Sequence, residues 1–126
     1  MDNVFAYPDP VWQRFAAPQR GGVLDGGGVV RVQARSPATA LVLELSLCPG
    51  PPVRARFRTL GCPVTIAVGA WLAQRLEEEG LAAVARIDAR GIRAALEIPE
   101  DRAHCALVGE DAILALRSAL QSSNVA

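Results

Sequence analysis

The sequence contains no lysine, so its thirteen basic residues are all arginines. Without a lysine, the chain can carry out neither Schiff-base chemistry on a lysine amine nor phosphate binding by a P-loop lysine. The formal net charge is +0, which provides no general attraction to nucleic acid or to an anionic membrane surface. We therefore expect neither a nucleic-acid partner nor a membrane partner.

Long apolar runs are missing as well. The longest candidate, Ala40 to Cys48, is interrupted by Glu44 and Ser46 and is too short for a bilayer span. The N-terminus has no basic region followed by an apolar stretch, so no secretory signal is expected. Three cysteines without an export signal indicate a reducing compartment. These features predict a cytoplasmic protein whose cysteines serve metal or redox chemistry.

The length of 126 residues and a hydrophobic fraction of 51% suit one domain with one core. We expect this domain to cover residues 1–126, with residues 1–6 and 122–126 frayed. Asp9 followed by Pro10 predicts a capped helix start. The glycine-rich segment from residue 19 to 28 comes after a helix and before a strand. That order favours a plain connector over a phosphate-binding loop.

A β-hairpin is the clearest structural signal. Two alternating segments lie on both sides of a turn at 48–52: leucines at every second position from 41 to 47 alternate with Val42, Glu44 and Ser46, and the residues at 53, 55, 57 and 59 alternate with three arginines. Pairing Leu47 with Val53 puts both apolar rows on one face and sets Glu44 opposite Arg56. The arginines of the other face form either a docking surface for an acidic partner or a solvated face, and we favour the solvated face.

After Cys62 the apolar period becomes helical, and Gly80 is expected to end that helix. The three glutamates at 77–79 are interpreted as a solvated face. A short helix, a helix capped by Asp88 and a long final helix are expected to follow. With a strand at 29–35 before the hairpin, the prediction is an α+β fold: an N-terminal helix, a three-stranded antiparallel sheet, then several C-terminal helices packed on one face.

Three residues could form a thiol and imidazole site. Cys62 lies where a strand ends and a helix begins, a position that favours its thiolate. His104, the only histidine, precedes Cys105, and imidazole and thiolate are common ligands of zinc and iron–sulfur centres. A small buried cysteine and a hydrogen-bonded histidine are the structural alternative for the pair at 104–105.

The hairpin geometry separates Cys48 from this site, because the strand between Cys48 and Cys62 spans roughly 25–30 Å at ~3.3 Å per residue. In the same register, Ala38 and Thr39 lie across from Cys62. Neither residue is a good ligand for a soft metal. The sequence therefore offers three donors and no evident fourth.

Several segments together resemble the NifU N-terminal or IscU-type iron–sulfur cluster scaffold family, over about residues 7–121. The matching segments contain Tyr-Pro-Asp-Pro-Val at 7–11, Gly-Val-Leu-Asp at 22–25, Ala-Arg-Phe-Arg-Thr-Leu-Gly-Cys at 55–62 and His-Cys-Ala-Leu-Val-Gly-Glu-Asp-Ala-Ile at 104–113. The resemblance implies an IscU/SufE-like fold. It also implies that Cys62, His104 and Cys105 bind a [2Fe–2S] cluster, iron or zinc.

The chain departs from the family pattern in two places. The first ligand cysteine and its aspartate are absent, because Ser-Pro-Ala-Thr stands at 36–39. The chaperone-recognition segment reads Ile-Pro-Glu-Asp-Arg at 98–102 and has lost one proline and the lysine. A cysteine desulfurase and apo-protein acceptors are the partners that the resemblance implies, whereas chaperone recognition is not expected.

The leading hypothesis is a divergent scaffold-like protein of iron–sulfur cluster assembly that is not an enzyme. A module that binds other proteins without metal is the second hypothesis. A sulfur-transfer subunit carrying a persulfide on Cys105 is the third. A Cys–His hydrolase is the least favoured, because no orienting acid or substrate pocket is evident.

Overall fold

The computed structural model describes residues 3, 5–36 and 39–123. Their helices and strands follow the order α1 (Asp9–Ala16), β1 (Val30–Ser36), β2 (Leu41–Cys48), β3 (Arg54–Leu60), α2 (Pro63–Glu79), η1 (Gly80–Ala85), α3 (Ala89–Leu96), η2 (Glu100–Arg102) and α4 (Ala103–Ser123). The predicted α+β class and element order are confirmed. No helix in this part of the chain is long and apolar enough to cross a membrane.

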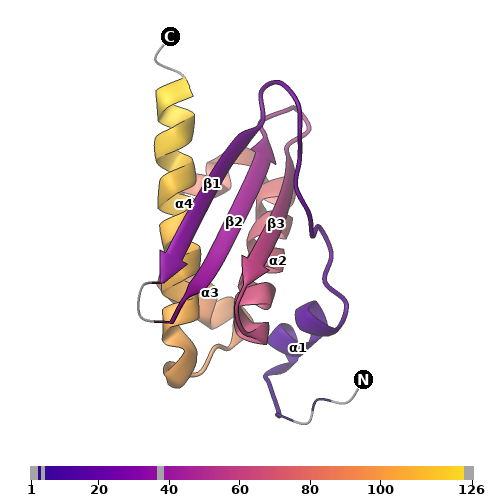
Figure 1. Ribbon diagram of the computed structural model, residues 1–126, viewed down its shortest axis with the longest axis vertical. Helices are drawn as coiled ribbons and strands as arrows, with labels where there is room; N and C mark the ends of the chain where they lie inside the picture. The colour runs from indigo at the N-terminus through magenta and orange to yellow at the C-terminus, as the bar shows by residue number, and fades with distance from the viewer. Residues whose placement is uncertain (1–2, 4, 37–38, 124–126) are drawn as a thin grey trace.

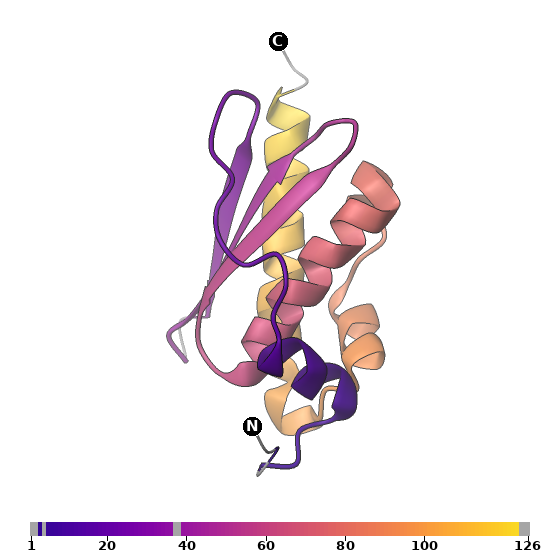
Figure 2. The same cartoon turned by 90° about the vertical axis from the view of Figure 1, so that its right-hand side faces the viewer.

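The three strands form an antiparallel sheet in the order β1-β2-β3. The helices lie on one side of it, with α4 behind β1 and α2 behind β3 (Figures 1 and 2). Both α2 and α4 begin at the end of the sheet where β3 finishes (Figure 1). The core face of β2 presents four buried leucines at alternating positions, Leu41, Leu43, Leu45 and Leu47. This alternation is the expected pattern for a strand with one covered face.

The register of the hairpin differs from the prediction by two residues. Leu47 pairs with Ala55, not Val53, and Glu44 pairs with Arg58. Cys48 still belongs to β2, so the turn occupies residues 49–53, a segment rich in prolines that cannot donate to the ladder. A shift of two residues leaves every side chain on its predicted face, which is why the core pattern nevertheless holds.

The starts of α1 and α3 can be compared with the capping residues that the sequence predicts. Asp88 caps α3, as predicted, by accepting a hydrogen bond from the Gly91 amide at 2.8 Å. Asp9 was predicted to cap α1, but Pro8 occupies the cap position and Asp9 lies in the first turn. A carboxylate there still interacts favourably with the helix dipole.

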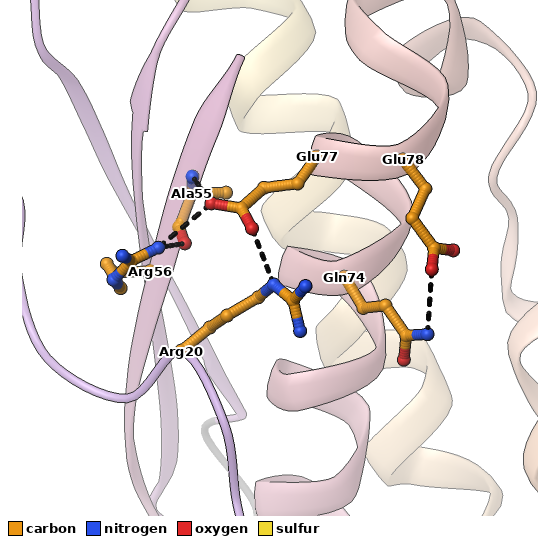
Figure 3. A network of polar contacts seen from close by, with 6 residues as sticks. All are labelled: Arg20, Ala55, Arg56, Gln74, Glu77 and Glu78. Atoms are coloured by element: carbon orange, nitrogen blue, oxygen red, sulfur yellow. Dashed lines mark hydrogen bonds and ion pairs between the residues drawn. The ribbon is translucent and has the colours of Figure 1, made fainter. Parts of the chain in front are cut away.

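Glu77, near the end of α2, joins the helix to the edge of the sheet (Figure 3). Its carboxylate accepts hydrogen bonds from Arg20 Nε at 2.6 Å, Arg56 Nη1 at 2.9 Å and the Ala55 amide at 2.9 Å. The backbone of Arg20 is in turn paired with Phe57, whose amide donates to the Arg20 carbonyl at 3.0 Å. The interpretation of Glu77 as part of a solvated face is therefore wrong.

The outer sheet face has its own ion pairs. Glu44 bonds Arg58 at 2.8 Å and lies 3.5 Å from Arg31, and both arginine side chains are about half exposed. Exposed pairs of this kind contribute little stability. The Glu77 cluster is less exposed and connects three segments that are distant in sequence, so we expect it to contribute more.

We predict that Glu77→Gln lowers the free energy of unfolding by about 1–3 kcal/mol at neutral pH, because three donors lose a charged acceptor. Glu78→Gln is the matched control, since the exposed Glu78 accepts only from Gln74 and lies near Arg75 within α2. Urea titration of both variants measures the difference. An equal loss in both variants would contradict the assigned role.

The pH dependence gives an independent check. Burial alone would raise the pKa of Glu77, but hydrogen bonds from the Ala55 amide, Arg20 and Arg56 lower it overall. A lowered pKa in the folded state stabilises the protein above the unfolded pKa, and this contribution disappears as the pH falls through the folded value. The stability gap between the wild type and Glu77→Gln should therefore shrink below about pH 4.

Candidate functional site

Cys62 occupies the position immediately before α2. It is the N-cap residue, with φ −83° and ψ 169°, and Pro63 begins the helix. The Cys62 carbonyl accepts from the amides of Thr65 and Ile66 at 3.0 and 3.2 Å. The Cys62 side chain is partly exposed. Proline in the first turn and an extended residue before it are the expected signals for a helix start, so the sequence itself places this thiol at the positive end of the helix dipole.

Cys105 lies in the first turn of α4 and is completely buried. Its Sγ atom lies 3.6 Å from the Sγ atom of Cys62. The prediction that these two cysteines are neighbours in the folded chain is confirmed. His104 precedes Cys105 in the same turn and is partly buried.

Thr65 completes the polar contacts of the sulfur pair. Its hydroxyl donates to Cys105 Sγ at 3.5 Å and lies 3.5 Å from Cys62 Sγ. The side chain of Thr65 is fully buried among apolar residues, where a hydroxyl needs a hydrogen-bond partner. The sulfurs provide that partner, so the three side chains form one connected cluster.

The two thiols have very different acidities. A hydrogen bond from Cys105 lowers the pKa of Cys62, with further help from the Thr65 hydroxyl and from the amides of Thr65 and Val64. The pKa of Cys105 is raised by its bond to Cys62 and by burial. At neutral pH the pair therefore holds its negative charge on Cys62, the member that is exposed to solvent.

The structure brings together two of the three predicted donors. Among the described residues, no three His, Cys, Asp or Glu side chains are arranged so that they could hold a metal ion. His104 is next to Cys105 in the sequence, and its role as a metal ligand stays a prediction. Cys48 ends β2 and pairs with Arg54, at the opposite end of the sheet from the start of α2 (Figure 1). This agrees with its predicted exclusion from the site.

The residues expected across from Cys62 are only partly described. Ala38 lies outside the described residues. Thr39 is exposed, in the turn between β1 and β2, and its amide donates to the Ser36 carbonyl at 3.3 Å. The two-residue correction of the register also removes the argument that placed Ala38 opposite Cys62, because Leu60 pairs with Val42.

Thr65 is the residue of the site that the sequence analysis missed. Its spacing from Cys62 carried a signal, since the cap residue and the third residue of a helix are brought back together by the first turn. A polar residue three positions after a cysteine that begins a helix is therefore a candidate to contact its sulfur.

The chain is similar to known proteins over most of its length. The family described as NifU-like N terminal domain matches residues 6–124. Two similar proteins are each named iron sulfur cluster assembly protein 1, mitochondrial, from Eremothecium gossypii and Kluyveromyces lactis. Each is 27% identical over 115 residues, which is 86% of this chain. The aligned region spans 75% of the first relative and 64% of the second.

The expected cytoplasmic location is contradicted by these relatives, since both are named mitochondrial. The lack of a secretory signal and the presence of unpaired cysteines argue against export. Neither observation distinguishes the cytosol from the interior of an organelle.

We predict that Cys62 reacts with iodoacetamide at a rate that falls less than about threefold from pH 8 to pH 6, because its lowered pKa keeps it ionised. The rate of free N-acetylcysteine should fall roughly 50- to 100-fold over the same range. Mass spectrometry of the labelled peptides measures both. In Cys105→Ala, which removes the hydrogen-bond donor, the Cys62 rate should depend more steeply on pH. A Cys62 rate that follows free cysteine would contradict the assigned charge.

Proposed function

Because the chain belongs to the family of NifU-like N terminal domains, we propose that it acts in iron–sulfur cluster assembly as a scaffold-like carrier of metal. Cys62 and Cys105 are the proposed thiolate ligands, and His104 is the proposed third ligand. The cargo is zinc, iron or part of a [2Fe–2S] cluster. In this role the protein delivers its cargo to a partner and does not turn over a substrate.

The distance between the two sulfurs is the observation that carries the proposal. Two thiolates on one tetrahedral ion, each at a metal–sulfur distance of ~2.3 Å, lie about 3.8 Å apart. The Cys62 and Cys105 sulfurs lie 3.6 Å apart. An ion could therefore be bound with little movement of the backbone. Burial of Cys105 among apolar residues limits its contact with water, and the open side of the pair is at Cys62.

The number of donors limits the cargo. A [2Fe–2S] cluster needs four terminal ligands, whereas the described residues bring two thiolates together, and His104 is the proposed third ligand. We propose that the remaining positions are filled by a partner or by a small thiol. A cysteine desulfurase and the apo-proteins that receive clusters are the proposed partners, on the basis of the family.

A sulfur-transfer role with a persulfide on Cys105 receives less support. A donor protein must reach the sulfur that it modifies, and Cys105 is completely buried. Cys62 is the accessible member of the pair. If the chain accepts sulfur from a partner, the geometry therefore favours Cys62 as the first acceptor.

We predict one zinc ion per chain when the reduced protein is equilibrated with zinc in a competitive chelator assay. Cys62→Ser and Cys105→Ser should each weaken binding by at least about 100-fold, because each removes one of the two thiolates. His104→Ala should weaken binding by about 10-fold, as expected for a third ligand at an open site.

Cys48→Ser is the matched control and should bind zinc like the wild type. Circular dichroism of each variant should match the wild type, since the core of this fold does not depend on metal. Unchanged zinc affinity in Cys62→Ser, or loss of binding in Cys48→Ser, would overturn the proposed ligand set.

A further inference from the structure

The sulfur pair combines an accessible thiol with a buried one. Cys62 is partly exposed and Cys105 is fully buried, and their sulfurs lie 3.6 Å apart. Each cysteine lies at the beginning of its helix, Cys62 before α2 and Cys105 in the first turn of α4. The remaining cysteine, Cys48, ends β2 at the end of the sheet that lies away from the start of α2 (Figure 1). The chain therefore has one close pair of thiols and one separate thiol as an internal reference.

We propose that Cys62 and Cys105 form a site of thiol–disulfide exchange that reacts with low-molecular-weight disulfides and closes to a reversible intramolecular disulfide. The consequence for metal binding rests on the proposed function: a closed disulfide has no thiolate, so the redox state of the pair decides whether cargo can bind. The exchange itself follows from the geometry of the pair and does not require metal binding.

The distance requires only a small movement. A disulfide has a bond length of about 2.05 Å, so the sulfurs must approach by about 1.5 Å from their separation of 3.6 Å. Rotation about the side-chain torsions of residues at the ends of two helices can supply this without unwinding either helix. Thr65 Oγ1 lies 3.5 Å from both sulfurs and holds them on the same side of α2.

The reaction has two steps. In the first, the Cys62 thiolate attacks one sulfur of the small disulfide, which forms a mixed disulfide on Cys62 and releases one small thiolate. In the second, Cys105 loses its proton to solvent or to the departing thiolate and attacks Cys62 Sγ. The bond between Cys62 and the small thiol breaks, and a second small thiolate leaves. The pair loses two electrons and two protons, and the small disulfide is reduced to two thiols.

The order of attack follows from access. A small disulfide can reach Cys62 but cannot reach the buried Cys105 without local opening of the fold. Cys105 is therefore the resolving thiol, since its only sulfur neighbour is the atom that becomes activated in the first step. Cys48 has no such neighbour among the described cysteines, so its reaction should stop at the mixed disulfide.

Oxidised and reduced glutathione in defined ratios test the proposal, with Cys48→Ser as the background protein. After acid quenching and alkylation, intact-mass spectrometry should show loss of two hydrogens, with Cys62 and Cys105 both protected from alkylation. Adding Cys105→Ser should trap a stable glutathione adduct on Cys62. Adding Cys62→Ser instead should leave Cys105 reduced and free of adduct.

Three outcomes would overturn the exchange site. In the Cys48→Ser protein these are a Cys62 adduct that never resolves, disulfide-linked dimers in place of the intramolecular bond, and a pair that stays reduced in pure oxidised glutathione. Circular dichroism of the double variants checks that they are folded. As a second readout, thermal unfolding with and without reductant should show a higher Tm for the disulfide form, because the bond closes a loop between residues 62 and 105.

Zinc binding separates this proposal from the proposed function. The Cys48→Ser protein should bind zinc when reduced, lose at least about 100-fold in affinity when oxidised, and recover after treatment with a phosphine reductant. If the disulfide forms but the reduced protein binds no zinc, the exchange site holds and the metal-carrier function fails. If zinc binds equally to both states, the regulatory link is wrong although the exchange occurs.

Discussion

The close packing of α2 against α4 is the constraint on which the site depends. At Gly109 in α4, an added Cβ atom would lie only 2.6 Å from Val68 Cγ1 of α2, which is closer than packed carbon atoms tolerate. Because Gly109 has no Cβ atom, the Val68 side chain of α2 packs directly against the backbone of α4, and the two helices approach closely there. Both helices begin at the same end of the sheet (Figure 2). Their close approach therefore brings Cys62 and Cys105 together, although 43 positions separate them in the sequence.

Contacts at two points along α2 fix its position against the sheet. Gly69 lets the helix lie against the sheet, because an added Cβ would meet the Phe57 ring at 2.4 Å. Near the other end of α2, Glu77 bonds the edge of β3 and the connector at Arg20 (Figure 3). A helix fixed along its length presents its first residue at a defined position. The carboxylate of Glu77, fifteen residues after Cys62, thus helps to fix the helix that begins beside this thiol.

Sequence reasoning succeeded where the signal is local or periodic. The alternation of leucines in β2 identified the core face, and Gly80 and Asp88 marked a helix end and a helix start because their chemistry acts within one turn. The hairpin register failed because proline and glycine at 49–52 allow several turn lengths with the same facing of side chains. The prediction for Glu77 failed for a different reason. Its partners Arg20 and Arg56 lie far away in the sequence, and a run of three glutamates does not reveal which one turns toward the sheet.

For the site, the pairing of Cys62 with Cys105 could be predicted, since a cysteine at the start of a helix and a family resemblance agreed. The contact with Thr65 could have been predicted from the first turn alone. The position of the His104 side chain could not, because a neighbour in sequence on a helix points in a different direction. The predicted cytoplasmic location was wrong, because unpaired cysteines and the lack of a secretory signal do not distinguish the cytosol from the interior of an organelle.

We propose that Cys62 and Cys105 together bind one metal ion as its two thiolate ligands. X-ray absorption spectroscopy at the zinc edge tests it most directly, on reduced protein loaded with one equivalent of zinc. The account predicts two sulfur neighbours per zinc at about 2.3 Å, with lighter nitrogen or oxygen atoms completing the shell. Zinc surrounded only by nitrogen and oxygen, or by four sulfurs, would contradict it.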